Sequence, residues 1–302
     1  MNVLTFDIED WFHVIDNPAT DKVHSWASLE SRVAHNTDRI LLELSARGVK
    51  ATFFCLGWVA ESYPELIRRI AAEGHELGSH SYAHRPVYEQ DRETFQADLV
   101  RSIGVLEDVS GTRIQSFRAP GFSITRETPW AFNTLVENGI TVDCSIFPAR
   151  CPHGGWQHFC EAPSSIKVDA GVLREFPMSL RRILGVRFAC SGGGYFRLLP
   201  FPLIRGHFNK SSYSMSYFHP RDFDPSQPTV TGLSVFRKLK ARAGLSTAMF
   251  KLRKMLEEFD FVNVGRAVDL VDWSHAPLIT PQHIGCGQAT LSHAHLYSSR
   301  TS

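Results

Sequence analysis

Short strand-like runs alternate with helical segments up to residue 120, and this alternation is the feature that most constrains the fold. Four apolar runs, NVLTF, ATFFCLG, HELGSH and IQSFRAP, are separated by segments of helical periodicity. Strand, helix, strand, helix at this pitch is typical of a parallel sheet with helices outside it. With this number of units, the sequence predicts an α/β fold, a closed or nearly closed β/α barrel.

Three helices are expected between the strand-like runs, over residues 28–47, 62–74 and 91–111. In each, apolar residues recur at helical spacing and a glycine follows or closes the segment. Ser62 and Glu65 have capping-box spacing at the start of the second helix.

Composition limits the class of protein and of partner. With 43% hydrophobic and 21% charged residues, the chain has enough apolar material for a large core, which excludes a disordered or fibrous protein. The formal net charge of +1 leaves no broad basic field for nucleic acid or an anionic membrane. We therefore expect a small or neutral partner.

The N-terminal segment MNVLTFDIEDWF has neither a basic n-region nor an apolar run long enough for a signal peptide or membrane span. This favours a cytoplasmic protein without an integral membrane segment. The six cysteines are irregularly spaced, which favours reduced thiols over a disulfide framework.

Two further motifs have weaker interpretations. CPHGGWQHFC, from Cys151 to Cys160, has no common zinc spacing, so a surface loop is preferred to a metal site. SGGGYFRLLP contains three glycines, which most often form a flexible turn, but Tyr195 and Arg197 favour a loop that faces a sugar.

Polar side chains gather where the predicted strands end, which is where barrels of this type place their active sites. His80 and His84 in GSHSYAHRP are four residues apart and point the same way, as two ligands of one cation must. Such a pair alone is more often surface or core than metal-binding. Polar residues at four strand ends make a functional site the better interpretation: Asp7, Glu9 and Asp10 after the first strand, the two histidines after the third, Arg118 after the fourth, and His219 after SYSMSYF.

These motifs, in this order, resemble those of the polysaccharide deacetylases, the carbohydrate esterase family that includes chitooligosaccharide deacetylases. The matching stretches are TFDIED, HSYAH, RAP and YFH. The resemblance covers residues 1–225 and implies a deformed β/α barrel with fewer than eight complete units. Residues 226–274 resemble an extension that completes the barrel in a subgroup linked to exopolysaccharide and O-antigen synthesis. The serine-, threonine- and histidine-rich segment 275–302 is expected to be a disordered tail.

Two positions depart from the family pattern. Ile8 stands where the family has a second aspartate that binds the metal, and Gly121 stands where a tyrosine is common. The family uses the backbone N–H at the tyrosine position, which glycine retains. Relatives with an apolar residue at the aspartate position include metal-dependent deacetylases with an acid one residue later and metal-free amidohydrolases; Glu9 and Asp10 favour the former.

The resemblance implies a divalent metal, Zn²⁺ in first place, held by His80, His84 and one carboxylate. Because side chains alternate along a strand, Asp7 and Glu9 share one face, so Glu9 is the expected ligand and Asp10 the alternative.

The remaining roles also follow from the resemblance. Asp7 is the expected general base, Arg118 its orienting partner, Gly121 the oxyanion donor through its N–H, and His219 the general acid. Asp143 and Glu175 are both candidates for an acid that tunes His219.

The sequence thus predicts a metal-dependent N-deacetylase of an acetylated amino sugar or saccharide that releases acetate in surface polysaccharide biosynthesis. The substrate is a nucleotide sugar, a lipid-linked oligosaccharide or a polymer. Two alternatives stay open: a metal-free amidohydrolase acting on a small cyclic amide or ureide, and an inactive glycan-binding relative.

Overall fold

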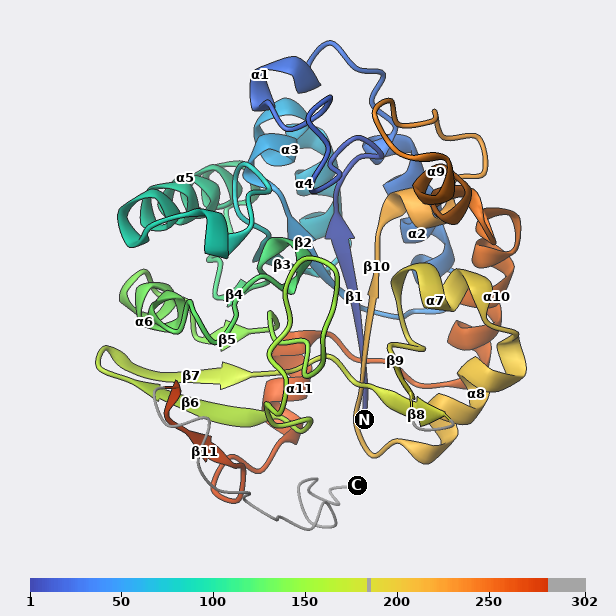
Figure 1. The fold of residues 1–302 in the computed structure, drawn as a ribbon. Helices are drawn as coiled ribbons and strands as arrows, with labels where there is room; N and C mark the ends of the chain where they lie inside the picture. The colour runs from blue at the N-terminus through green and yellow to red at the C-terminus, as the bar shows by residue number, and fades with distance from the viewer. Residues whose placement is uncertain (184–185, 282–302) are drawn as a thin grey trace.

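A mainly parallel sheet forms the centre of the molecule in the computed structural model, which describes residues 1–183 and 186–281. The strand order is β10-β1-β2-β3-β4-β5-β7-β6-β11 (Figure 1). The strands are β1 (Asn2–Ile8), β2 (Thr52–Cys55), β3 (Glu76–Ser79), β4 (Ser116–Phe117), β5 (Val142–Asp143), β6 (Ser164–Val168), β7 (Gly171–Glu175), β10 (Ser214–Phe218) and β11 (Leu278–Ile279). All neighbours pair in parallel except β6 and β7, which are antiparallel.

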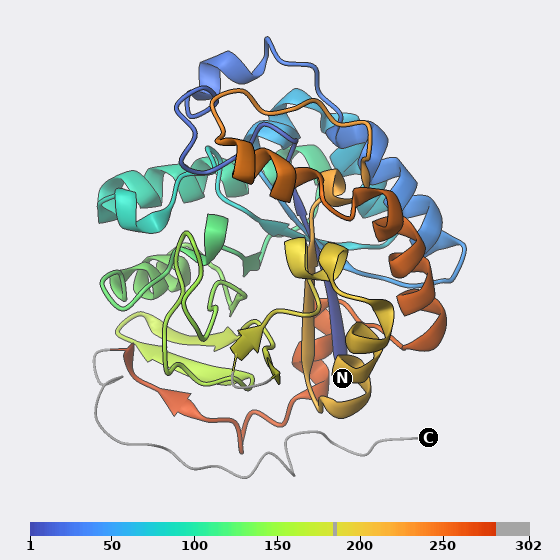
Figure 2. The same cartoon turned by 45° about the vertical axis from the view of Figure 1, so that its right-hand side comes forward.

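The sheet is an open barrel rather than a closed one. Within the described ranges, β10 and β11 stand at opposite ends of the strand order and do not pair with each other. Figures 1 and 2 show α2, α5, α6 and α10 around the outside of the strands. The predicted deformed β/α barrel is therefore confirmed, in this open form.

The three predicted helices are present as α2 (Val33–Ser45), α4 (Pro64–Ala72) and α5 (Arg92–Ser110). Asp91 caps α5 by accepting a hydrogen bond from the Thr94 N–H at 2.8 Å. The capping box predicted at Ser62 is wrong, because that residue ends a preceding helix, α3 (Gly57–Ser62), and the N-cap of α4 makes no side-chain hydrogen bond.

The other elements lie mainly in the second half of the chain. They are α1 (Val23–Trp26), α6 (Trp130–Glu137), α7 (Gly193–Leu198), α8 (Phe201–Lys210), α9 (Val235–Arg242), α10 (Leu245–Glu258) and α11 (Val264–Leu270), with the 3-10 turns η1 (Val87–Glu89), η2 (Pro120–Phe122) and η3 (Pro220–Phe223), and the hairpin β8 (Arg181–Ile183) and β9 (Val186–Phe188). No helix of the described chain is both long and apolar enough to cross a bilayer.

Alternation along β1 separates the core from the site. Leu4, Phe6 and Ile8 are fully buried in the larger apolar cluster, which includes residues of the outer helices. Asp7 points to the opposite face. Ile8 therefore stabilises the packing behind the site and takes no part in it.

The parallel register brings the ends of successive strands to one level. Ile8 pairs with Cys55, Cys55 with Ser79, and Ser79 with Phe117. The residues that follow β1, β3 and β4 therefore leave the sheet together at its carboxyl edge.

The segment after residue 225 contributes α9, α10 and α11 and reaches back to β1, where Val262 exchanges backbone hydrogen bonds with Asn2 and Leu4 at 3.0 Å each. The predicted tail from residue 275 lies mostly outside the described residues. Its described start is not disordered throughout, because Leu278–Ile279 form β11 and pair with β6.

Candidate active site

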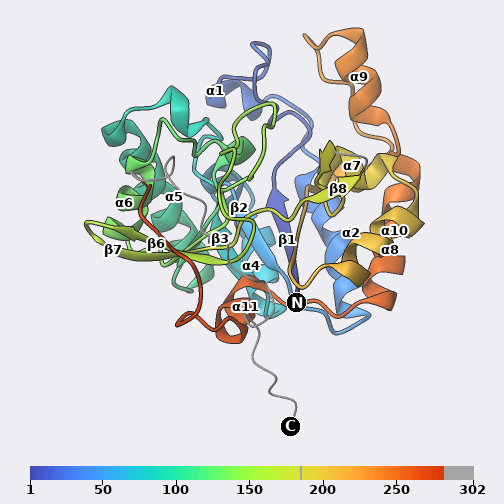
Figure 3. The same cartoon turned by 60° about the horizontal axis from the view of Figure 1, so that its bottom comes forward.

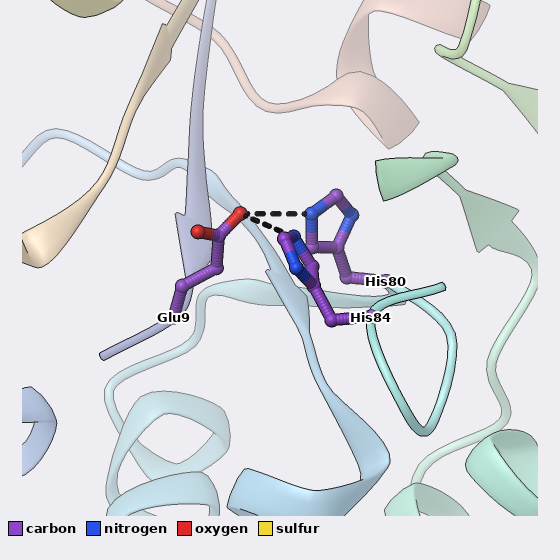
Figure 4. A group of neighbouring side chains, drawn as sticks. All are labelled: Glu9, His80 and His84. Carbon is purple, nitrogen blue, oxygen red and sulfur yellow. Dashed lines mark hydrogen bonds and ion pairs between the residues drawn. The ribbon is translucent and has the colours of Figure 1, made fainter. Parts of the chain in front are cut away.

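Three buried side chains from two strand ends meet at the carboxyl edge of the sheet (Figure 4). Glu9 follows β1, while His80 and His84 lie in the loop after β3. Oε1 of Glu9 is 3.2 Å from Nε2 of His80 and 2.9 Å from Nε2 of His84. Among the described residues, this is the only group of three or more His, Cys, Asp or Glu side chains whose ligand atoms all lie within 4.8 Å of one another.

The hydrogen bonds of His80 test whether this cluster suits a cation. Nδ1 of His80 lies 2.7 Å from the carbonyl oxygen of Arg118, and a carbonyl only accepts, so Nδ1 carries the hydrogen. The lone pair of Nε2 on a neutral His80 then faces the Glu9 carboxylate, another acceptor. A cation between them would satisfy both, and two imidazole nitrogens with one carboxylate oxygen form a donor set that suits Zn²⁺.

The second oxygen of Glu9 supports the same conclusion. Oε2 is buried and makes no hydrogen bond, with Nη2 of Arg221 3.4 Å away. Burial alone would raise the pKa of Glu9, but His84, His219 and Arg221 around it lower that pKa well below its ordinary value. The carboxylate is therefore held ionised, and the residues present fit a divalent metal.

Asp10, the alternative ligand, faces away from the histidines. Its carboxylate accepts hydrogen bonds from the backbone N–H groups of Trp11 at 2.8 Å, Arg32 at 2.9 Å and Val33 at 3.1 Å, and from the Ser31 hydroxyl at 2.6 Å. It thereby accepts hydrogen bonds from free N–H groups at the start of α2, as the side chain of an N-cap residue does. Glu9, and not Asp10, is therefore the carboxylate grouped with the two histidines.

Asp7 is held by Arg118. Nη1 of Arg118 donates to Oδ1 of Asp7 at 2.7 Å, and also to the Thr5 hydroxyl at 2.7 Å. The guanidinium is fully buried, and its Nε donates to the carbonyl of Cys144 at 3.2 Å. Burial lowers the pKa of Arg118, but the Asp7 carboxylate outweighs it and raises that pKa overall, so the ion pair persists. This is the geometry that the predicted orienting role needs.

His219 approaches the cluster from β10, with Nε2 3.6 Å from Oε1 of Glu9. Its Nδ1 lies 3.0 Å from Oδ2 of Asp222, which accepts the hydrogen bond. Nε of Arg197 is 3.1 Å from the other oxygen of Asp222. Burial lowers the pKa of His219, but Glu9 and Asp222 outweigh burial and raise it, which favours the protonated imidazolium.

Asp222 corrects the prediction that Asp143 or Glu175 tunes His219. These two face each other across β5 and β7, and they accept hydrogen bonds from Ser145 and Ile146 instead. Burial raises the pKa of Asp143 to about 6, and burial together with Asp143 raises the pKa of Glu175 well above its ordinary value. The signal that sequence reasoning missed was the HPRD turn, in which an acid three residues after His219 reaches back to it.

Three of the four predicted catalytic residues, Asp7, Gly121 and His219, border one pocket of about 270 Å³, just below the range for small-molecule sites, roughly 300–1,000 Å³, while Arg118 lies behind Asp7 and does not line it. Asp7, Glu9, His84, Gly121 and His219 line it. Sequence reasoning did not anticipate Arg221, which also lines it.

Gly121 has a φ of +63°, and a Cβ there would lie 2.7 Å from Cδ1 of Ile15 and 2.8 Å from Cβ of His153. The tyrosine common at this position in the family therefore does not fit here, because the loops of Ile15 and His153 occupy its space.

The two residues of the glycine-rich loop have different places. Tyr195 lines the pocket, as a sugar-facing residue would. Arg197 does not, because it is buried between Asp222 and the carbonyl of Ala241, to which Nη1 donates at 2.6 Å. Arg197 therefore gives no support to the prediction of a sugar-facing loop, and its guanidinium instead positions Asp222.

The segment Cys151–Cys160 forms no metal cluster in the described part of the chain. Cys151 and His153 line the pocket, and Nδ1 of His153 lies 2.9 Å from Oδ2 of Asp16. The start of this loop therefore lines the pocket, which the sequence did not predict. The five described cysteines are free, as predicted, and Cys286 lies outside the described residues.

Comparison with known proteins agrees with this geometry. Residues 3–141 match the model of the polysaccharide deacetylase family, and residues 144–269 match a domain of unknown function, DUF3473. A peptidoglycan-N-acetylglucosamine deacetylase of Bacillus cereus is 33% identical over 96 residues, which are 32% of this chain and 35% of that protein. A chitooligosaccharide deacetylase of Rhizobium leguminosarum bv. trifolii is 38% identical over 65 residues, 22% of this chain and 30% of that protein. The chain thus matches about a third of the length of these relatives.

The fold has a close counterpart among solved structures. A crystal structure from Mycobacterium smegmatis, assigned as a polysaccharide deacetylase, superposes with a TM-score of 0.60 at 21% identity, over 89% of this chain and 88% of that one. The family model and the curated relatives agree that residues 3–141 form a polysaccharide deacetylase domain, and the solved structure shows that the fold is shared beyond this domain.

Proposed function

We propose that this chain is a metal-dependent hydrolase that removes the acetyl group from an N-acetylated amino sugar and releases acetate and a free amine. The observation that carries the proposal is that Asp7 and His219 border the pocket of the Glu9–His80–His84 cluster, each held by a buried partner. A binding module needs no paired base and acid, which is why we favour an enzyme over an inactive glycan-binding relative.

Glu9, His80 and His84 would hold the divalent metal, with Zn²⁺ the best match to the donor set, and the metal would supply a Lewis acid for the acetyl carbonyl and the attacking water. The remaining steps belong to the protein. Asp7, oriented by Arg118, accepts the proton of the water as it attacks. The N–H of Gly121 donates to the oxyanion that develops on the acetyl oxygen.

His219 completes the reaction by donating a proton from Nε2 to the departing amine. Its Nδ1–H stays bonded to Asp222, which keeps the imidazole oriented and favours its charged form before the transfer. Base and acid thus stand on separate strand ends, β1 and β10.

The names of the relatives support an acetylated saccharide as substrate, since they are deacetylases of peptidoglycan N-acetylglucosamine and of chitooligosaccharides. We place the reaction in surface polysaccharide biosynthesis in the cytoplasm, on a nucleotide sugar, a lipid-linked oligosaccharide or a nascent polymer.

The decisive experiment measures acetate release by the purified chain, loaded with zinc, from N-acetylglucosamine oligomers and from a nucleotide-linked N-acetylglucosamine. We expect the wild-type chain to release acetate. A chelator should abolish this release and added zinc should restore it. The Asp7→Asn variant should release no acetate. Release of ammonia or ring opening of a cyclic ureide that is insensitive to chelator would instead establish the metal-free amidohydrolase and overturn the proposal.

A further inference from the structure

Helix α9 exposes three large apolar side chains and buries none of its residues. Val235 is 75% exposed, Phe236 74% and Leu239 66%. Figure 3 shows α9 standing out from the body at the end of the molecule toward which β1 points. A contiguous apolar surface of this kind, on an element that packs its polar side inward, marks an interaction site.

The chain around α9 is strongly basic, although the whole protein is nearly neutral. Residues 225–256 contain seven Lys and Arg and no Asp or Glu. The basic residues of α9 itself are Arg237, Lys238, Lys240 and Arg242. The formal net charge of +1 therefore does not reveal the local cationic segment at this helix.

The hydrogen bonds of Arg237 fix which side of α9 faces outward. Its guanidinium donates to the backbone oxygens of Ile15 at 3.1 Å and Asp16 at 3.2 Å. At about 100° per residue, Arg237 lies on the side of the helix opposite Val235, Phe236 and Leu239. The bond to the body therefore turns the apolar side directly away from the protein.

The same helical geometry places basic side chains at both borders of the apolar side. Around the helix axis, Lys240 lies about 40° beyond Phe236 at one border of the apolar side. Arg242 and Lys238 lie within about 60° of Val235 at the other border. A short helix with an aromatic and aliphatic face between lysines and arginines is the pattern of helices that lie in a bilayer interface, where the long cationic side chains reach the headgroups.

The contact of α9 with the loop at Ile15 joins this surface to the pocket. Ile15 lines the pocket of Asp7 and Glu9, and its backbone oxygen accepts the hydrogen bond from Arg237. The outward side of α9 and the rim of the pocket are therefore parts of one end of the molecule.

We propose that α9 docks the protein on an anionic lipid bilayer, with Phe236 and Leu239 inserted at the interface and the flanking basic residues on the headgroups. Attachment through α9 brings the rim of the pocket to the membrane surface. The docking rests on the exposure and charge of α9 and does not depend on the deacetylase activity.

The test is sedimentation of the full chain with vesicles of equal parts phosphatidylglycerol and phosphatidylcholine, and with vesicles of phosphatidylcholine alone. We expect binding to the anionic vesicles that weakens as salt is added. The double variant Phe236→Ser/Leu239→Ser should lower the partition coefficient at least tenfold, because it removes two apolar side chains from the interface. Lys238→Glu/Lys240→Glu should lower it by a similar factor.

Leu42→Ser is the matched control, since Leu42 is 70% exposed on α2 and its loss should leave vesicle binding unchanged. Acetate release from a soluble oligosaccharide should be the same in all these variants, which shows that each is folded. Binding that is absent, equal on both kinds of vesicle, or unaffected by the Phe236/Leu239 variant would overturn the proposal. If the wild-type chain does not bind vesicles but forms a dimer that the Phe236→Ser/Leu239→Ser variant disrupts, the surface binds a second copy of the chain instead.

Discussion

The carboxylate of Asp222 accepts a hydrogen bond from Nδ1 of His219 at 3.0 Å. The same carboxylate accepts the backbone N–H of His219 at 2.9 Å, and Nε of Arg197 holds its other oxygen at 3.1 Å. The arginine keeps the carboxylate in place, and together with His219 it lowers the pKa of Asp222 in spite of burial, which opposes this. Because Nδ1 is engaged, Nε2 is the nitrogen that faces the pocket and can transfer a proton.

The first prediction concerns Asp222 as a positioning residue. Asp222→Asn should lower kcat by about a hundredfold or more, because the imidazole loses both its orientation and the charge that favours its protonated form. KM and bound metal should stay near the wild-type values. Asp224→Asn is the matched control, since that carboxylate pairs with Arg32 at the N-cap of α2 and should affect stability rather than kcat. Loss of metal from Asp222→Asn would assign the residue to the metal site.

The second prediction separates proton transfer from metal binding. Asp7→Asn and His219→Ala should each lower turnover by about a hundredfold or more, as expected for a lost general base or acid. Both variants should retain the metal, measured by elemental analysis after gel filtration. Wild-type turnover in His219→Ala would mean that the late motif is structural.

The sequence predicted β1–β4, β10 and the helices α2, α4 and α5, with polar residues at the strand ends, because these follow from local periodicity and from the geometry of parallel sheets. Glu9 lies beside the two histidines just beyond the end of β1, on the side that strand alternation predicted, and its role as a metal ligand stays a prediction. The capping box failed because periodicity does not show that Ser62 already belongs to α3.

Arg197 and Asp222, which the sequence did not identify, act through a contact between residues that are distant in the sequence. Arg197 is 25 residues before Asp222, and only the packing of α7 beside η3 makes it a partner. The surface of α9 was missed for a different reason. The net charge of the whole chain averages over the basic segment around this helix. The spacing of its apolar residues is the same as in a helix that buries them, so the sequence does not show that they are exposed.

The third prediction compares two adjacent carboxylates with different tasks. Glu9→Ala should lose the metal, because it removes the carboxylate at the two histidines. Asp10→Ala should keep the metal but lower the free energy of unfolding by about 1–2 kcal/mol, because the N–H groups of Arg32 and Val33 lose their cap. Metal content and urea unfolding measure the two effects. Metal loss in Asp10→Ala with retention in Glu9→Ala would reverse the assignment.

The last prediction concerns a histidine that does not line the pocket. His207 is buried on α8, with Nε2 3.3 Å from the Ser179 hydroxyl, and burial together with the charge of Arg181 lowers its pKa to about 4. In the unfolded chain, the histidine pKa is about 6.5, so His207 binds a proton as the pH falls below this value. In the folded protein, His207 binds that proton only near pH 4. Stability from this site is therefore fully present above about pH 6.5 and is lost as the pH falls toward about 4, by about 2–3 kcal/mol.

Urea unfolding of chelator-treated protein, followed by circular dichroism between neutral pH and about pH 4.5, checks this loss. His207→Gln keeps a polar side chain but cannot titrate, so its free energy of unfolding should fall less over the same range by nearly that amount. The other histidines are common to both proteins and cancel in the comparison. Equal losses in wild type and His207→Gln would mean that His207 accepts its proton in the folded state as readily as in the unfolded one.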